Sequence, residues 1–168
     1  MARSKTLGAD VTRTHVVVLD AGDSVIDALT DFSGDRQVHS ASFTGVGAFS
    51  RSTLAFFDVE TKQYQEFAVD EQTEVLSLIG DIVQGADGGR QVHAHVVLGR
   101  RDGTTRGGHL RSATVRPTLE IVVIESPQQL TRRYDPDCGL ALIDLGREPA
   151  PGEDPLRYGL APANRHTT

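Results

Sequence analysis

The chain of 168 residues carries a formal net charge of −6, with 38% hydrophobic and 24% charged residues. This length and composition predict a single globular domain with a buried core. The longest aliphatic runs, VVVL at 16–19 and IVVI at 121–124, are far shorter than the roughly 20 residues that span a bilayer. The single cysteine, Cys138, excludes an internal disulfide, and the chain shows no signal sequence, so we expect a cytoplasmic protein.

The chain begins with a strand and a helix. Residues 14–19 (THVVVL) predict a short strand, and the helix that follows is expected to begin at Ser24, whose side chain can cap it, and to end at Gly34. Apolar residues recur at helical spacing along it: Val25, Ile26, Leu29 and Phe32. Such a helix needs a sheet on which to bury its apolar side.

Strand-like segments follow one another from Val38 onward. They cover 38–49, 52–59, 63–69, 73–83, 90–98, 105–110 and 118–125, with turn residues at most junctions. Strands joined by short turns pair antiparallel, so the predicted fold class is α+β, a single domain with a largely antiparallel sheet flanked by one or two helices. We expect residues 1–10 to be a flexible segment, 11–145 to form the domain and the proline-rich residues 146–168 to form a tail.

Three of the six histidines lie in HAHVVLGRRDGTTRGGHLR, residues 93–111. His93 and His95 are two positions apart, so in a strand they point to the same face. A three-residue RDG loop, with Gly103 in the left-handed conformation, would place His109 directly opposite His95 and Arg111 opposite His93. A two-residue turn, or a bulge at the glycines before His109, would instead turn His109 to the other face.

Three neutral imidazoles on adjacent strands suit zinc or another late first-row divalent ion. Three protein ligands leave one coordination position open, which favours binding or catalysis over a purely structural site. The alternative is that His93, His95 and His109 are ordinary core or surface histidines.

The histidines lie in the one basic segment of an acidic protein. Residues 90–116 hold six arginines and one acid, a local charge of +5, so the remainder of the chain carries −11. We expect Arg111, with Gly107 and Gly108 beside it, to receive an anionic group, because a guanidinium forms two hydrogen bonds to a carboxylate or phosphate. The alternative is a solvated hairpin with scattered surface arginines.

The motifs TGVGAFSRSTLAFFD, EVLSLIGDI, HAHVVL, GGHL, TLEIVV and LTRRYD with GLALIDL occur in the order and at the spacing of one known family. Across roughly residues 11–145 the chain resembles the PPC domain, a module conserved in plants and prokaryotes, in its free-standing prokaryotic form. The resemblance implies an antiparallel sheet flanked by helices, a homotrimer and membership of a predicted DNA-binding class.

The resemblance also assigns residues. It places the family's metal site on His93, His95 and His109, and its late arginine on Arg132 or Arg133, for which a structural ion pair is expected. Glu120 lies inside an apolar strand, where it either faces solvent or a partner, or orients a ligand histidine. The minor-groove-reading RGRP core of the plant AT-hooks is missing from this sequence, which together with the acidic net charge weakens the inference to DNA.

Other sites find no support in the sequence. A cupin needs a glutamate four or five residues after HxH, where this chain has Gly99 and Arg100, and GxSxG, GKS, GKT and complete GxGxxG patterns do not occur. Two functions remain. The first is a trimeric DNA-binding or regulatory module, and the second is a metal-dependent enzyme or sensor acting on a small anionic molecule at the three histidines.

Overall fold

The computed structural model describes residues 3–7, 12–85 and 87–144. The elements in chain order are β1 (Arg3–Leu7), β2 (Thr14–Asp20), α1 (Val25–Asp35), β3 (Ala41–Asp58), β4 (Gln63–Val69), β5 (Thr73–Gln84), β6 (Arg90–Gly99), β7 (Thr105–Glu125), β8 (Thr131–Asp135) and β9 (Leu140–Asp144). The nine strands of these described ranges belong to one sheet, in which every pair is antiparallel except the short β5–β8 contact. The α+β class and the single domain are therefore confirmed.

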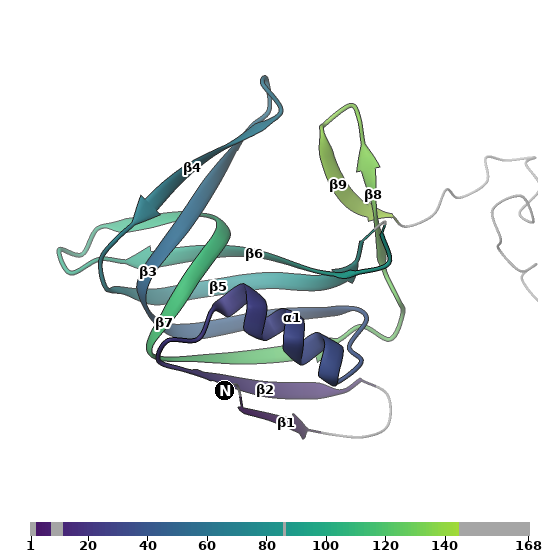
Figure 1. The fold of residues 1–168 in the computed structure, drawn as a ribbon, viewed down its shortest axis with the longest axis horizontal. Coiled ribbons are helices and arrows are strands. Elements are labelled where there is room, and N and C mark those ends of the chain that lie inside the picture. Colours follow the sequence, from purple (N-terminus) through teal and green to yellow (C-terminus); the bar gives the residue numbers. More distant parts are fainter. Residues whose placement is uncertain (1–2, 8–11, 86, 145–168) are drawn as a thin grey trace, which may run out of the picture.

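Two long strands organise the sheet. β3 and β7 run side by side and bend, so that β7 pairs with β2 at its C-terminal end and with β6 at its N-terminal end. Because β6 also pairs with β5, and β5 with β3, the four strands β3, β5, β6 and β7 pair in a closed cycle. Two hairpins, β3–β4 and β8–β9, rise from the same side of this sheet (Figure 1).

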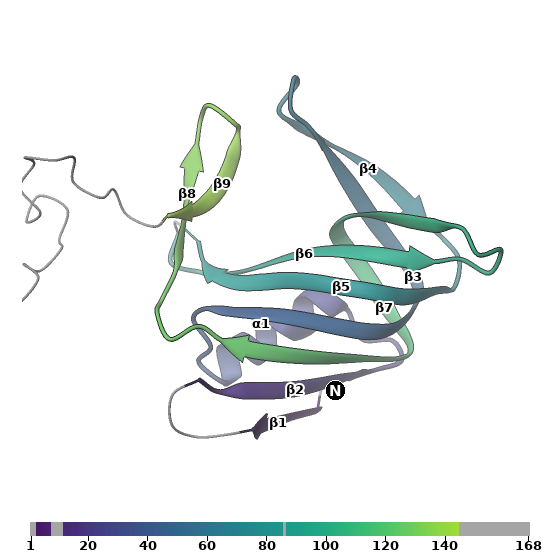
Figure 2. The same cartoon turned by 180° about the vertical axis from the view of Figure 1, so that it is seen from behind.

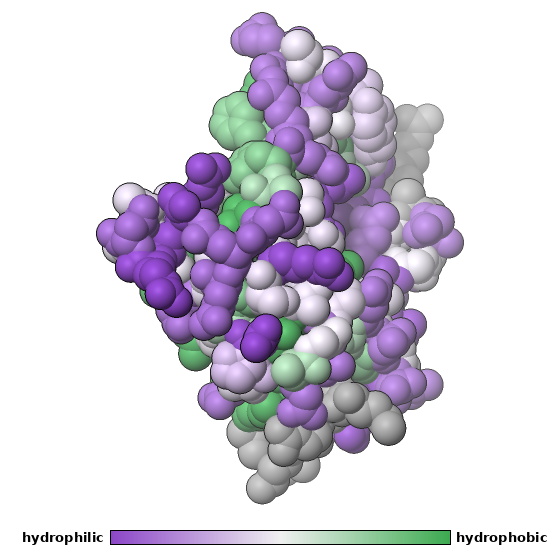
Figure 3. All heavy atoms as spheres, turned by 60° about the vertical axis from the view of Figure 1, so that its left-hand side comes forward, coloured by the Kyte–Doolittle hydropathy of each residue, from purple (hydrophilic) through white to green (hydrophobic). Residues whose placement is uncertain are grey.

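Helix α1 covers one face of the sheet and leaves the other uncovered, as the view from behind shows (Figure 2). Its buried residues Val25, Leu29 and Phe32 pack in one core cluster with alternate residues of the strands, among them Leu78 and Ile121. From the side of the β6–β7 hairpin the surface is mainly hydrophilic, with hydrophobic residues only in patches (Figure 3). No helix in the described ranges is long and apolar enough to cross a membrane.

The element boundaries differ from those expected at β3, β7, α1 and β1. The segments 38–49 and 52–59 are one strand, β3, and the segments 105–110 and 118–125 are one strand, β7. α1 continues through Gly34 to Asp35, because the left-handed residue lies later, at Gln37. Part of the N-terminal segment expected to be flexible pairs with β2 as β1, and the predicted tail, 146–168, lies outside the described residues.

Candidate metal centre

The β6–β7 hairpin has the register expected from a three-residue loop. Arg100 N–H donates to Thr104 O at 2.9 Å, and Gly103 has a φ of +81° in the loop between them. The ladder then places His95 directly opposite His109, with no bulge at Gly107 or Gly108. This ladder ends at the histidine pair, where His109 also pairs with Ala55 of β3 on the other edge of β7.

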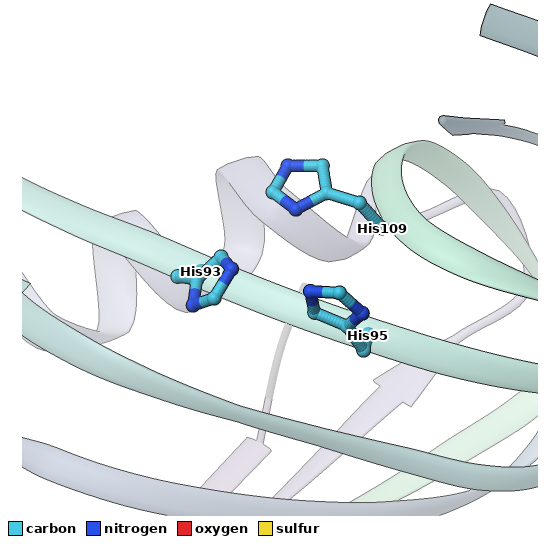
Figure 4. A group of neighbouring side chains, drawn as sticks. All are labelled: His93, His95 and His109. Carbon is cyan, nitrogen blue, oxygen red and sulfur yellow. The ribbon is translucent and has the colours of Figure 1, made fainter. Parts of the chain in front are cut away.

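The three histidine rings face a common space (Figure 4). His93 and His95 alternate with buried Ala94 and Val96, so both project away from the core. The ring centroids lie 5.1–5.3 Å apart, and one nitrogen of each ring lies within 4.8 Å of the others. Ligand nitrogens of a tetrahedral zinc ion are about 3.4 Å apart, so small side-chain rotations would bring all three onto one ion.

The chemistry of these nitrogens fits a metal ion. Nδ1 of His109 is buried and has no hydrogen-bond partner among the described residues, which is costly for a polar atom unless a ligand satisfies it. Burial, followed by the proximity of His93, lowers the pKa of His95. Burial and then His93, His95 and Arg111 lower the pKa of His109 to about 4. Both rings are therefore neutral at neutral pH and need lose no proton to bind a metal.

The carboxylate of Asp81 and the guanidinium of Arg132 lie beside His93. Asp81 on β5 pairs with His93 across the strands, and its Oδ2 lies 3.3 Å from His93 Nδ1. Arg132 of β8 donates from Nη2 to both Asp81 oxygens, at 2.7 and 2.9 Å. Burial opposes ionisation of Asp81, but the hydrogen bonds from His93 and Arg132 hold its pKa below the usual value. Arg132, expected in an ion pair, thus lies in one beside the histidines.

Arg111 lies on the other side of the cluster, against β4. Its Nε donates to Glu66 Oε1 at 2.8 Å, and its guanidinium lies 5.4 Å from the centre of the Tyr64 ring. The Tyr64 ring in turn lies 5.0 Å from the ring of His109. Arg111 is therefore near the histidines, but from the β4 side and not opposite His93.

A cleft of about 560 Å³ opens beside the histidines. Its polar lining includes His93, His109, Arg90, Arg111, Arg132 and Tyr64. Its apolar lining comes from α1, β6 and β9, and includes Ile26, Val92, Leu140 and Leu142. The tips of the two raised hairpins meet, because Lys62 Nζ donates to Pro136 O at 2.8 Å.

The remaining predicted residues lie elsewhere or have a packing role. Glu120 lies opposite Val46 and lines a separate hollow on the sheet with Ile79 and Val122. A Cβ on Gly107 would lie 3.0 Å from Val96 O, and a Cβ on Gly108 would lie 2.8 Å from Ala55 O, so both glycines permit close strand packing. The sequence did not single out Asp81 or Tyr64 as site residues.

Comparison with known proteins matches this chain to one protein family. The Plants and Prokaryotes Conserved (PCC) domain matches residues 7–127. A structure named "putative DNA binding protein", from Bacteroides thetaiotaomicron, has 30% identity and a TM-score of 0.76, covering 84% of this chain and 96% of that one. The metal-containing protein AF0104 of Archaeoglobus fulgidus has 31% identity and a TM-score of 0.74, covering 83% and 98%. A PPC protein of Pyrococcus horikoshii has 27% identity and a TM-score of 0.74, covering 84% and 94%.

One curated relative is much longer than this chain. The bifunctional protein GlmU of Synechococcus sp. (strain JA-3-3Ab) is 29% identical over 140 residues, which cover 82% of this chain and 21% of that protein. The chain thus spans about a fifth of the length of that relative.

Proposed function

The chain belongs to the Plants and Prokaryotes Conserved domain family, and from that premise we propose that it is a self-associating protein that binds a small anionic molecule at a divalent metal ion. His93, His95 and His109 would hold the ion, for which zinc is the first expectation. The observation that carries the proposal is the meeting of these three rings beside a cleft lined by arginines.

The residues of the cleft suit an anion with a small apolar body. A bound divalent ion would polarise an oxygen atom of a water molecule or of the ligand. Arg111 and Arg90 line the same cleft, and Arg90 Nε donates a hydrogen bond to Val38 O at 3.0 Å. Ile26, Leu140 and other apolar residues form the rest of the lining, against which the body of the ligand would pack.

DNA binding is the second candidate. Structures similar to this chain, including one from Ralstonia eutropha at 32% identity and a TM-score of 0.73, are named as putative DNA-binding proteins. That structure is matched over 78% of this chain and 90% of its own length. Arg101 and Arg106 are exposed on the β6–β7 hairpin, where they could contact phosphates.

A pair of arginine variants distinguishes the two candidates. We expect Arg111→Ala to weaken binding of an anion, probed with inorganic phosphate and with acetate, by about tenfold or more in zinc-loaded protein, because a charge-assisted hydrogen bond is lost. Arg106→Ala is the matched control and should leave that affinity unchanged. Isothermal titration calorimetry measures both.

The DNA candidate predicts the reverse pattern. If DNA is the ligand, Arg106→Ala weakens binding of a labelled duplex and lowers the slope of log affinity against log salt by about 1. Fluorescence polarisation at several salt concentrations measures that slope. Anion binding that is equal in wild type and Arg111→Ala would contradict the small-molecule function.

Self-association is proposed through the uncovered sheet face. Val46 and Ile79 are 57% and 54% exposed there, and Leu76, Val122 and Ile124 are also exposed. Ile79 lies opposite His95, so the apolar face reaches the metal centre. Monomeric proteins rarely leave such a patch uncovered, and the family resemblance favours three copies. Glu120 lies within this face, and we propose that it approaches the histidines of a neighbouring copy.

We expect Val46→Asp to dissociate the assembly. A carboxylate introduced into a covered apolar face loses its hydration without a partner, which costs several kcal/mol and should weaken association by about a hundredfold or more. Size-exclusion chromatography with light scattering measures the mass. Val59→Asp is the control, because Val59 is 67% exposed at the β3–β4 turn. A wild type that stays monomeric at high concentration would overturn the proposal.

A further inference from the structure

We infer that Asp81 and Arg132 form a positioning pair that sets the metal affinity of His93 and couples it to the docking of the β8–β9 hairpin. The inference rests on the proposed metal site and adds to it two residues outside the ligand set. It is based on the contacts of the Asp81 carboxylate, which meets both the ligand residue His93 and the guanidinium of Arg132 from the hairpin.

The carboxylate fixes which nitrogen of His93 is free. An ionised carboxylate only accepts hydrogen bonds, so His93 Nδ1 carries the hydrogen and donates to Asp81 Oδ2. Arg132 Nη2 also lies 3.3 Å from this nitrogen, but it has shorter contacts with the two Asp81 oxygens. Nε2 of His93 is then the nitrogen without a hydrogen. Figure 4 shows the His93 ring turned with one nitrogen toward the space between the three rings. A histidine held in this way is a better ligand, because ring and tautomer are set before the metal arrives.

Arg132 fixes the carboxylate. Its side chain is only 10% exposed, and its Nη1 donates to Ala141 O of the same hairpin at 2.9 Å. One guanidinium thus joins the body of the β8–β9 hairpin to the residue that orients His93. Along the strands, only Gln84 and Thr131 pair between β5 and β8, so the ladder itself attaches the hairpin weakly.

A coupling between the hairpin and the metal follows. If docking of the hairpin through Arg132 favours metal binding, metal binding must favour docking by the same factor. The hairpin supplies Leu140 and Leu142 to the lining of the cleft. Loading of the metal would therefore also secure one wall of the ligand site.

Zinc affinity tests the pair directly. We expect Asp81→Asn and Arg132→Met each to weaken zinc binding by about 10- to 100-fold, as the loss of a hydrogen-bond partner behind a ligand histidine usually does. Competition with a chromophoric chelator measures the affinity. Arg133→Met is the matched control, because Arg133 is on the same strand but pairs at the surface with Asp144. Arg132→Lys, which keeps the charge without the planar fork, should recover only part of the affinity.

Two further readouts separate positioning from general stability. Long-range proton–nitrogen NMR spectra should show the Nδ1–H form of His93 in wild type and a mixture of tautomers in Asp81→Asn. Limited proteolysis should cut the β8–β9 hairpin more slowly with zinc in wild type, and at the same rate with and without zinc in Arg132→Met.

The possible results bear on different claims. A wild-type protein that binds no zinc would overturn the proposed function itself. A wild type that binds zinc, with equal affinity in Asp81→Asn and Arg132→Met, would overturn the positioning pair and leave the metal site standing. Should Arg132→Met fail to fold, Asp81→Asn decides, because it changes the charge while keeping the shape of the side chain.

Discussion

His109→Ala should lower the zinc affinity of the protein by about 10²–10³-fold. Structural zinc sites with four ligands bind with roughly 10–16 kcal/mol, so an equal share for one ligand is about 2.5–4 kcal/mol. His109 is the one ligand that comes from β7, opposite His95. Its removal leaves only the two histidines of β6, which can hold an ion from one side alone.

The same variant should change the metal-free protein little. Within the part of the chain that the structure describes, Nδ1 of His109 has no hydrogen-bond partner, so its removal breaks no hydrogen bond there. The loss is that of ring packing against Tyr64, His93 and His95. In the presence of zinc, by contrast, wild type should gain thermal stability by mass action, and His109→Ala should not.

Elemental mass spectrometry of protein purified without an affinity tag or added metal, followed by chelator competition, measures this effect. His39→Ala is the control, because His39 is exposed and outside the cluster. About one equivalent of zinc per chain in wild type and in His39→Ala, and none in His109→Ala, is the expected result. Equal zinc content in wild type and His109→Ala would rule out the three-histidine site.

The sequence predicts the three-histidine cluster because each step depends on local rules. His93 and His95 are two residues apart in a strand, so their side chains point to the same face. Gly103 selects the loop that sets the register of the β6–β7 hairpin. The position of Arg111 does not follow from the same rules. The ladder with β6 ends at His109, and the register of β7 against β3 shifts between Leu110 and Ser112, so Arg111 lies at an irregularity of the sheet.

Asp81 illustrates a contact that one sequence does not reveal. It meets His93 only through the pairing of β5 with β6, whose register is set across a loop rich in glycine. Several loop conformations fit that composition, and each would bring a different β5 residue to His93. Glu120 was the carboxylate considered for orienting a ligand histidine, but it lies between Val46 of β3 and Val18 of β2, in the part of β7 that does not pair with β6.

Gly80 lies inside β5, between Ile79 and Asp81. It pairs with Phe43 on one side and with Ala94 on the other. The tight packing around it explains why no side chain is present. A Cβ at this position would collide with the backbone carbonyl of His93 and with the ring of Phe43, whose Cε1 would lie 2.9 Å away.

Gly80→Ala should therefore destabilise the protein by about 3 kcal/mol or more, at the upper end of overpacking effects. Neither neighbour can easily move, because Phe43 is buried and the His93 carbonyl lies in the paired part of β6. For a chain of this size the melting temperature should fall by roughly 6–12 °C. Because the same backbone positions Asp81 against His93, zinc affinity should fall as well, even at temperatures where the variant is folded.

Gly34→Ala is the matched control. Gly34 lies in α1, and a Cβ there would meet no atom within 4 Å. Alanine in a helix is better than glycine by about 0.5–1 kcal/mol, so this variant should melt at a higher temperature than wild type and bind zinc equally well. Thermal unfolding followed by circular dichroism compares the three proteins. An equal melting temperature for Gly80→Ala and wild type would refute the close packing of β5 against Phe43 and β6. That packing is what sets the contact between Asp81 and His93.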